Sequence, residues 1–296
     1  MSGSRDPGGF YCYLATPFDA AGAVDTGLIP DYVDEMIRAG VDGVTCVAST
    51  CEGPYLSDDE RRTLIASVGA AVAGRTGLNV GVSAVSTKQV IENAKHAQDH
   101  GATCLMIEMQ QYFPITAAGI YRHYAEIAEA VTLPIRLYNL PVPTRVDLTP
   151  STICKLGSIA AIRSVKDASG EVERLQQIRE ACGDRFTLYC GLHFQLLEGM
   201  RMGADGWEVM LHPLIAPDLV RLFRTVSAAP DSSASAAHFA RWLPVFRFFR
   251  QHGVPQSIKA LSRRTPMQLG SMRRPQADLS AALQDEVWTL TREALG

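Results

Sequence analysis

Two hydrophobic patterns alternate along the chain. Short, continuous apolar runs rich in β-branched residues are each followed by a loop of small residues and then by a longer amphipathic stretch. The first pattern is typical of buried strands, and amphipathic stretches of about 10 to 15 residues are typical of helices that cover a sheet. The alternation occurs eight times, which predicts strands at residues 10–15, 43–48, 78–82, 103–108, 134–139, 161–166, 186–191 and 206–211.

The helices expected between these strands carry end signals. The clearest candidates cover residues 28–40, 57–74 and 87–101. Ser57 followed three residues later by Glu60 is a capping box, and Gly40, Gly74 and Gly101 are placed to close their helices. The segments AGVDG, HGATC and MGADG share one form, which indicates that a single βα unit is used repeatedly.

Eight βα units predict a (β/α)8 barrel, whose usual length of about 250 residues fits this chain better than an open doubly wound sheet. After about Val226 the strand pattern stops, and the stretch SAAPDSSASAAH is expected to connect to helices near residues 239–251, 256–261 and 278–294. We therefore predict a catalytic barrel over residues 8–228 and a C-terminal helical region over residues 229–296.

Composition narrows the range of functions. An apolar fraction of 47% with 20% charged residues is that of a globular protein with a sizeable core. The formal net charge of -3 provides no basic field for a nucleic-acid backbone or an anionic membrane. The N-terminus lacks a signal-peptide pattern, and no apolar run reaches the roughly 18 residues of a membrane span. We expect a soluble protein whose partners include neither nucleic acid nor membrane.

Cysteine and histidine usage predicts neither a redox centre nor a metal. The seven cysteines are odd in number and form no C-x-x-C pair, and several lie in apolar runs, where a free thiol behaves as a small hydrophobe. This usage is typical of a reducing compartment, so we expect the cytoplasm. His193 and His212 lie too far apart, without local ligand spacing, for zinc. We expect no cofactor.

The chemistry of such a barrel lies at the carboxyl ends of its strands and in the loops that follow. Polar residues in those positions are therefore candidates for the active site. They are Ser49, Thr50, Glu52, Gln110, Gln111, Tyr112, Tyr138, Asn139, Lys166, His193 and Glu208.

Lys166 ends a predicted strand and should be aimed into the mouth of the barrel. In one interpretation the amine is structural and pairs with the neighbouring Asp167. In the other, burial disfavours its charged form, and a neutral amine near pH 7 forms a Schiff base with a ketone. Tyr138, on the adjacent strand, is either a packed aromatic or the phenol that moves the protons of this chemistry.

Ser49 and Thr50 lie in the loop VASTCEGPYLSDDER, which contains small and hydroxyl-bearing residues. Such a loop lets backbone N–H groups converge on an anion, for example a substrate carboxylate. By itself this signal is weak, because Ser and Thr after a strand are usually turn residues.

Four ordered motifs resemble those of the dihydrodipicolinate synthase and N-acetylneuraminate lyase family of class I Schiff-base barrels. The loop just described is similar to the family's GTTGE or GSTGE followed by LSxxER, and YNLPVPTRVDLTP resembles YNxPxRTGxDLxP. AIRSVKDASGEVERL resembles IxGIKDSSGDxxR, and YCGLHFQLLEGMRMGADGWEVM resembles SGxDxxxLxxxxxGxxGxIS. The resemblance covers nearly the whole chain, and the order of the motifs makes it much more specific than any one of them.

This resemblance implies that Lys166 is the Schiff-base lysine and Tyr138 the proton-relay phenol. It also implies that Ser49 and Thr50 bind the carboxylate of a pyruvate-like substrate through backbone N–H groups, with a hydroxyl in the relay. Tyr112 would replace one of the family's paired tyrosines as a substrate-binding residue. Members of the family are commonly homotetramers, arranged as a dimer of dimers.

The departures from the family pattern concern the substrate. The synthase has an arginine that binds the second substrate's carboxylate where this chain has Pro143, and Arg145 lies two residues further on. Cys51 replaces the loop glycine, and His193 replaces an aspartate. His193 is a rim acid or base, or is structural, as a lone histidine more often is.

Glu208 occupies a position that is usually small or aliphatic in the family. A carboxylate inside a barrel is costly unless it is paired, so Glu208 either binds substrate or is the partner of a cation. We favour the substrate-binding role.

The sequence therefore predicts a lyase that acts on pyruvate or a related 2-oxo acid through a lysine imine, by aldol cleavage, condensation or dehydration. The first alternative is 4-hydroxy-tetrahydrodipicolinate synthase, which Pro143 weakens. The second alternative is a catalytically silent barrel that only binds a small acid.

Overall fold

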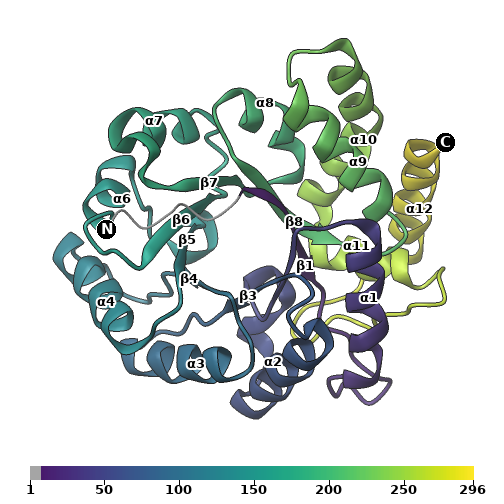
Figure 1. Cartoon of the computed structure of the whole chain (residues 1–296). Coiled ribbons are helices and arrows are strands. Elements are labelled where there is room, and N and C mark those ends of the chain that lie inside the picture. The colour runs from purple at the N-terminus through teal and green to yellow at the C-terminus, as the bar shows by residue number, and fades with distance from the viewer. Residues whose placement is uncertain (1–7) are drawn as a thin grey trace.

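A computed structural model describes residues 8–296 and contains a closed barrel of eight parallel strands in sequence order. The predicted (β/α)8 fold is confirmed (Figure 1). Each predicted strand is present within two residues of its expected bounds. The strands are β1 Gly9–Leu14, β2 Gly43–Cys46, β3 Gly77–Gly81, β4 Cys104–Glu108, β5 Ile135–Asn139, β6 Ile162–Asp167, β7 Thr187–Cys190 and β8 Gly206–Leu211.

Helices surround the barrel and bury the outer faces of its strands (Figure 1). Nearly every strand residue is buried, as expected for a parallel sheet covered outside and filled inside by side chains. The helices of the ring are α1 Ile29–Ala39, α2 Asp58–Val72, α3 Thr87–Asp99, α4 Ala117–Ala130, α5 Pro141–Thr144, α6 Pro150–Leu156, α7 Glu173–Cys182, α8 Leu196–Arg201 and α9 Ala216–Ala228. Short 3-10 turns include η2 Ser49–Cys51, η3 Gly53–Tyr55 and η5 His193–Gln195.

The end signals read from the sequence act as expected. At the start of α2, the Ser57 side chain accepts from the Glu60 N–H while the Glu60 side chain accepts from the Ser57 N–H, which completes the capping box. Gly40 ends α1 with a φ of 91°, a left-handed conformation that glycine adopts without steric cost. These local signals set where each helix meets its strand.

Three further helices form the C-terminal region: α10 Ser233–His252, α11 Val254–Ser262 and α12 Ala281–Leu295. They lie together on one side of the barrel, where α10 packs against α9 and α11 packs against β8 (Figure 1). The Ala/Ser-rich stretch was expected to be a connection, but α10 begins within it, after the Ser232 side chain caps the first turn. Small residues are compatible with a helix once a cap satisfies its first N–H groups.

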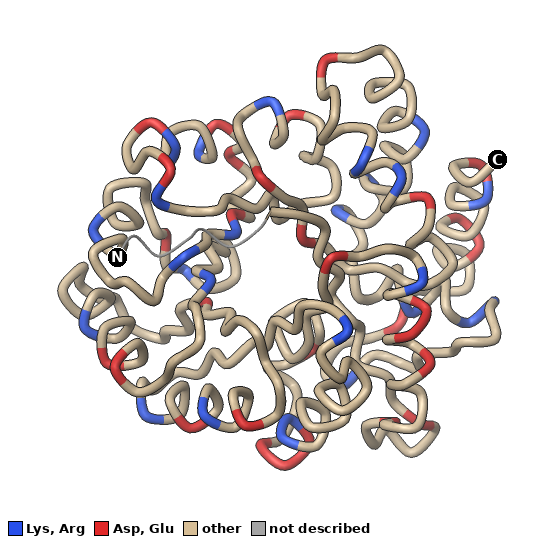
Figure 2. The backbone as a smooth tube through the Cα atoms, in the orientation of Figure 1, with Lys and Arg blue, Asp and Glu red and all other residues tan. Residues whose placement is uncertain are grey.

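Charged residues occur along the outer helices, with positive and negative positions interspersed (Figure 2). This mixed distribution is consistent with the small net charge of -3. Within residues 8–296, no helix has the length and apolar character needed to cross a membrane.

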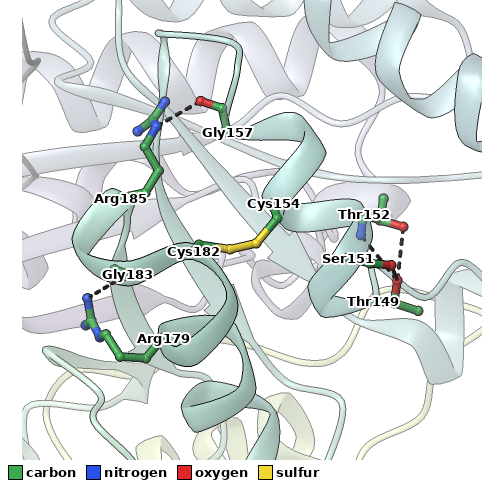
Figure 3. The surroundings of a disulfide bond; sticks show 9 residues. All are labelled: Thr149, Ser151, Thr152, Cys154, Gly157, Arg179, Cys182, Gly183 and Arg185. Carbon is green, nitrogen blue, oxygen red and sulfur yellow. Dashed lines mark hydrogen bonds between the residues drawn. A yellow bond between two sulfur atoms is a disulfide. The ribbon is translucent and has the colours of Figure 1, made fainter.

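Cys154 of α6 and Cys182 of α7 form a disulfide, with 5.5 Å between their Cα atoms (Figure 3). The expectation that the cysteines are free thiols is wrong for this pair, because two helices that are neighbours in space bring together residues 28 positions apart. The two helices flank β6 in the sequence. The other five cysteines are buried free thiols.

We predict that the denatured, unreduced protein reacts with five equivalents of a thiol reagent. Replacing both Cys154 and Cys182 by serine should lower the free energy of unfolding by about 3 to 4 kcal/mol, since the unfolded chain regains the entropy of an open loop. Urea unfolding with and without reductant measures this. Reductant should destabilise the wild type by a similar amount and leave the double variant unchanged; seven reactive thiols in the unreduced protein would contradict the pairing.

Candidate active site

A pocket of about 340 Å³ opens where the strands end, between the barrel and the C-terminal helices. Its floor is made by side chains at the carboxyl ends of β1, β5 and β6, and its wall by the loop after β2 and the start of α11. Residues that line it include Tyr13, Ser49, Thr50, Tyr138, Lys166 and Gln256.

Lys166 is 1% exposed, and its amine lies between two aromatic rings. Its Nζ donates a hydrogen bond of 2.6 Å to the Tyr13 hydroxyl and lies 3.9 Å from the centre of that ring and 4.3 Å from the centre of the Tyr138 ring. Gly191 leaves room for the lysine, since a Cβ there would stand 2.8 Å from Lys166 Cε. The amine is held in a buried, aromatic setting at the base of the pocket.

The surroundings of Lys166 lower its pKa to about 8. Burial is the largest cause, because it disfavours the charged amine. Glu208, Cys51 and Glu108 oppose this effect by favouring the charged form, and Arg136 adds to it. A substantial fraction of the amine is therefore neutral, and nucleophilic, near physiological pH.

Asp167 does not serve as the partner of the Lys166 amine. Successive strand residues point to opposite faces, and Asp167 accepts hydrogen bonds from Asn139 Nδ2 at 2.8 Å and from Ser169. The structural interpretation of Lys166, as half of a pair with its neighbour, is not supported.

Tyr138 lies directly opposite Lys166 in the pairing of β5 with β6. Burial raises the pKa of Tyr138 well above its usual value, whereas the neighbouring Thr50 and Ser49 hydroxyls lower it. The phenol therefore keeps its proton near neutral pH and is linked to two hydroxyls through which a proton can move.

The loop after β2 has an unusual backbone. Val47 and Glu52 have φ values of 60° and 61°, in a left-handed region that is rare for such residues and costly for a β-branched one. Between them, η2 presents Ser49 and Thr50 to the pocket, and the first N–H groups of such a turn have no partner within it. Cys51 is buried beneath, with its thiol 3.6 Å from the Thr45 carbonyl oxygen.

Glu52 fixes this loop to the C-terminal region. Its carboxylate lies 2.6 Å from Lys259 Nζ of α11 and accepts a hydrogen bond of 2.9 Å from the Arg273 backbone N–H. Both side chains of the ion pair are almost fully buried. Lys259 is therefore engaged in an ion pair. Lys166, in contrast, lines the pocket, and no carboxylate of residues 8–296 lies at ion-pair distance from its amine.

The structure places Glu208 below the pocket and not in its lining. Glu208 is fully buried in the barrel, where its carboxylate lies 3.0 Å from Arg136 Nη1 and accepts hydrogen bonds from Thr45 at 2.6 Å and Asn79 at 3.0 Å. The favoured substrate-binding role is thus corrected: Glu208 is the partner of a cation. Arg136 in turn stacks on the Tyr189 and Tyr11 rings.

Tyr112 and Arg145 also lie outside the pocket. Tyr112 is 85% exposed and lines a separate hollow with Phe113 and Arg145. Within one chain, Tyr112 therefore does not line the pocket that holds Lys166, and its substrate-binding role stays a prediction.

His193 lines the pocket but is held by the protein. Its Nε2 lies 3.0 Å from the Met210 carbonyl oxygen, and its ring packs against Trp207 and Phe249. Burial lowers the pKa of His193 to about 4, so the ring is uncharged near neutral pH. These contacts favour its structural interpretation. In residues 8–296, no group of three or more His, Cys, Asp or Glu side chains is arranged to hold a metal ion.

Comparison with known proteins assigns the family. The family model described as "Dihydrodipicolinate synthetase family" matches residues 6–294. The chain belongs to this family. It is 30% identical over 278 residues to 4-hydroxy-tetrahydrodipicolinate synthase of Prochlorococcus marinus (strain MIT 9515), which covers 94% of this chain and 92% of the relative.

Solved structures agree with this assignment. Dihydrodipicolinate synthase from Agrobacterium tumefaciens str. C58 superposes with a TM-score of 0.90 at 27% identity, over 98% of each chain. The synthase from Acinetobacter baumannii, complexed with pyruvate, superposes with a TM-score of 0.91 at 27% identity, over 97% of this chain and 98% of that synthase chain. The sequence-based prediction of a Schiff-base lyase in this family is confirmed.

Three residues of the site were missed in the sequence. Tyr13 and Glu108 lie at the carboxyl ends of β1 and β4, so the positional rule that selected Lys166 would also have selected them. Arg136 gave only a weak signal, a single cation within an otherwise apolar strand. Its partner, Glu208, lies on β8, 72 residues further along the chain.

We predict that Arg136→Met lowers the free energy of unfolding by about 3 to 5 kcal/mol, because the Glu208 carboxylate would remain buried without its cation. Urea unfolding measures the loss. Arg38→Met removes an ion pair whose side chains are 66% and 44% exposed, and it should cost at most about 1 kcal/mol. Equal effects of the two substitutions would show that the Arg136–Glu208 pair is not a structural requirement.

Proposed function

We propose that the Lys166 amine attacks the ketone of pyruvate or a related 2-oxo acid and that the resulting imine serves for carbon–carbon cleavage, condensation or dehydration. The observation that carries this proposal is a buried amine with a pKa near 8, held between two phenols in the floor of a pocket. The pyruvate complex of the Acinetobacter baumannii relative supports the substrate class.

The other residues have distinct roles in the proposal. Tyr138 gives and takes protons at the oxygen that leaves as water, and the hydroxyls of Thr50 and Ser49 extend that path. The N–H groups at the start of η2 bind the substrate carboxylate. Once formed, the protonated imine withdraws electrons from the adjacent carbon, so aldol and dehydration reactions share one intermediate.

The distal part of the pocket favours an uncharged substrate chain. Its polar groups there are neutral: Gln276 Nε2 donates to the Tyr55 hydroxyl at 2.8 Å, and Gln256 lies beside Gln276. The Glu52 carboxylate is already neutralised by Lys259. We therefore propose a 2-oxo acid whose remaining groups are hydroxyls or apolar carbons. The synthase, which the named relatives suggest, is the alternative.

A silent acid-binding barrel is the less supported alternative, because it would not need a buried amine with a lowered pKa next to a phenol relay.

We also propose that residues 8–228 form the catalytic barrel and that residues 229–296 close its pocket. A homotetramer, built as a dimer of dimers, would cover the exposed side chains of Tyr112, Phe113 and Val142, which are 82% to 85% exposed. We propose the cytoplasm as its location, because the five buried free thiols suit a reducing compartment; the Cys154–Cys182 disulfide is the feature that does not.

We predict that Lys166→Ala abolishes the adduct that borohydride traps with pyruvate, because Lys166 is the only lysine among residues 8–296 that lines the pocket. Intact mass reads the adduct. Lys155→Ala is the matched control, since Lys155 is an exposed lysine of α6, and it should trap pyruvate normally. Covalent trapping by the Lys166 variant would assign the nucleophile to another lysine.

We predict that pyruvate traps normally while condensation with aspartate semialdehyde is negligible. A guanidinium holds a carboxylate through two charge-assisted hydrogen bonds of roughly 1.5 to 3 kcal/mol each. A site without the guanidinium should therefore bind the carboxylated aldehyde more weakly by orders of magnitude. Pro143 offers no such group, and Arg145 lies outside the pocket. Steady-state assays test this. Efficient condensation that Arg145→Ala removes would show that Arg145 replaces the missing arginine.

A further inference from the structure

Glu108 is a buried carboxyl at the mouth of the barrel with one oxygen left unpaired. It is the last residue of β4, it lies opposite Tyr138 in the pairing with β5, and it is 4% exposed. Its Oε1 accepts a hydrogen bond of 3.1 Å from Gln110, and its backbone N–H donates to Ser83 Oγ at 2.9 Å. Its Oε2 has no partner in hydrogen-bond geometry among residues 8–296.

Ser49 is a neighbour of this carboxyl, and its Oγ is likewise buried without a partner in good geometry among the residues described. This hydroxyl is close enough to the Glu108 carboxyl to lower its pKa, and it also interacts with the Tyr138 hydroxyl. A continuous series of polar groups therefore runs from Lys166 through Tyr138 and Ser49 to Glu108. Two neighbouring buried oxygens without hydrogen-bond partners lower the stability of the fold. Such groups are rare in native proteins and call for an explanation, such as a role in the reaction.

Several groups face Glu108 from the elements around it. Lys166 of β6 and Arg61 of α2 stabilise its anion, and the hydrogen bond from Gln110 does the same. The phenols of Tyr13 (β1), Tyr138 (β5) and Tyr124 (α4) also interact with its charge. Burial outweighs the stabilising groups and raises the pKa of Glu108, so this carboxyl retains its proton at a higher pH than an exposed one.

Imine formation requires one proton that the substrate and a neutral lysine cannot provide. The amine nitrogen bonds to the ketone carbon, the carbon–oxygen bond breaks, and the oxygen leaves as water; a neutral amine and a ketone thus become a protonated imine only if one proton is added. Tyr138 cannot supply it alone, because burial raises its pKa and makes a persistent phenolate unfavourable. His193 is uncharged, and Glu52 is paired with Lys259.

We propose that Glu108 supplies this proton to Tyr138 through the hydroxyl of Ser49 and takes it back when the imine is hydrolysed. The proton passes from Glu108 to Ser49, from Ser49 to Tyr138, and from Tyr138 to the departing oxygen. The products are water, a protonated imine and a Glu108 carboxylate, whose negative charge stabilises the new cation. Glu108 does not touch the substrate and is a proton-relay residue, and this role rests on the proposed Schiff-base function.

The relay determines the dependence of the rate on pH. The neutral amine is present above the pKa of Lys166, and the protonated carboxyl is present below that of Glu108. A reaction that needs both has a bell-shaped profile whose two apparent pKa values belong to the coupled pair. Removal of the carboxyl should leave a single limb that rises with pH toward a midpoint set by the lysine, at a lower pH than in the wild type because the Glu108 charge raises the pKa of Lys166.

The test measures the rate of adduct formation with pyruvate in a single turnover, quenched with borohydride from pH 5 to 9 and read by intact mass. Glu108→Gln keeps the size and polarity of the side chain, and at pH 7 it should form the adduct about 100-fold more slowly, within the usual range for a positioned acid. It should lose the falling limb, and its final adduct yield should stay within about twofold of the wild type. Glu108→Asp should restore the bell shape.

Ser49→Ala interrupts the path but keeps the carboxyl and the backbone, so it tests the relay even if the Glu108 variant folds poorly. It should also lose the falling limb, and the double variant should be no slower than the slower single variant, because both changes break one path. Ser83→Ala is the matched control: it removes a neighbour of the Glu108 backbone and should keep the bell shape.

The outcomes separate the two proposals. If the wild-type protein forms no adduct with pyruvate or another 2-oxo acid, the proposed function fails, and the relay fails with it. If the wild type forms the adduct but the Glu108→Gln profile matches it, or if the effects of Ser49→Ala and Glu108→Gln multiply independently, the relay is overturned while the Schiff-base function stands.

Discussion

Burial of the Lys166 amine is the constraint on which the rest of the site depends. A lysine in water is almost entirely protonated near pH 7 and cannot attack a ketone. Here β6 carries the side chain into the barrel, where the Tyr13 hydroxyl and the faces of two aromatic rings replace water. The pKa falls to about 8. Burial of the amine lowers the stability of the fold, and the large apolar core of a closed barrel offsets this loss.

The charges beneath the pocket make this burial effective. Arg136 and Glu208 form a fully buried ion pair in the barrel, and they act on Lys166 in opposite directions: the carboxylate raises its pKa and the guanidinium lowers it. Because the two effects oppose each other, desolvation decides the protonation state of the amine. Thr45 and Asn79 donate hydrogen bonds to the other oxygen of the Glu208 carboxylate, and these bonds hold the ion pair in place.

The C-terminal helices complete the site instead of forming a separate unit. The buried pair between Glu52 and Lys259 joins the loop after β2 to α11, so it links the residues expected to bind the substrate carboxylate to the distal wall of the pocket. The distal wall carries amides and a phenol, whereas the floor carries the amine and the phenols to which we assign the chemistry. In the proposed reaction, recognition of the substrate chain and chemistry at the ketone are thus separated along the pocket.

The sequence by itself determined the eight strands, the helix ends and the strand-end positions of Lys166 and Tyr138, because these depend on short-range signals such as apolar periodicity and capping residues. It did not determine which side chains meet across the barrel. Tyr13 reaches Lys166 from 153 positions away, and Glu208 finds Arg136 instead of the substrate. Likewise, Cys154 meets Cys182 only because their helices pack side by side. Closing the barrel brings distant strand ends to one mouth, and only that closure decides which buried polar groups satisfy one another.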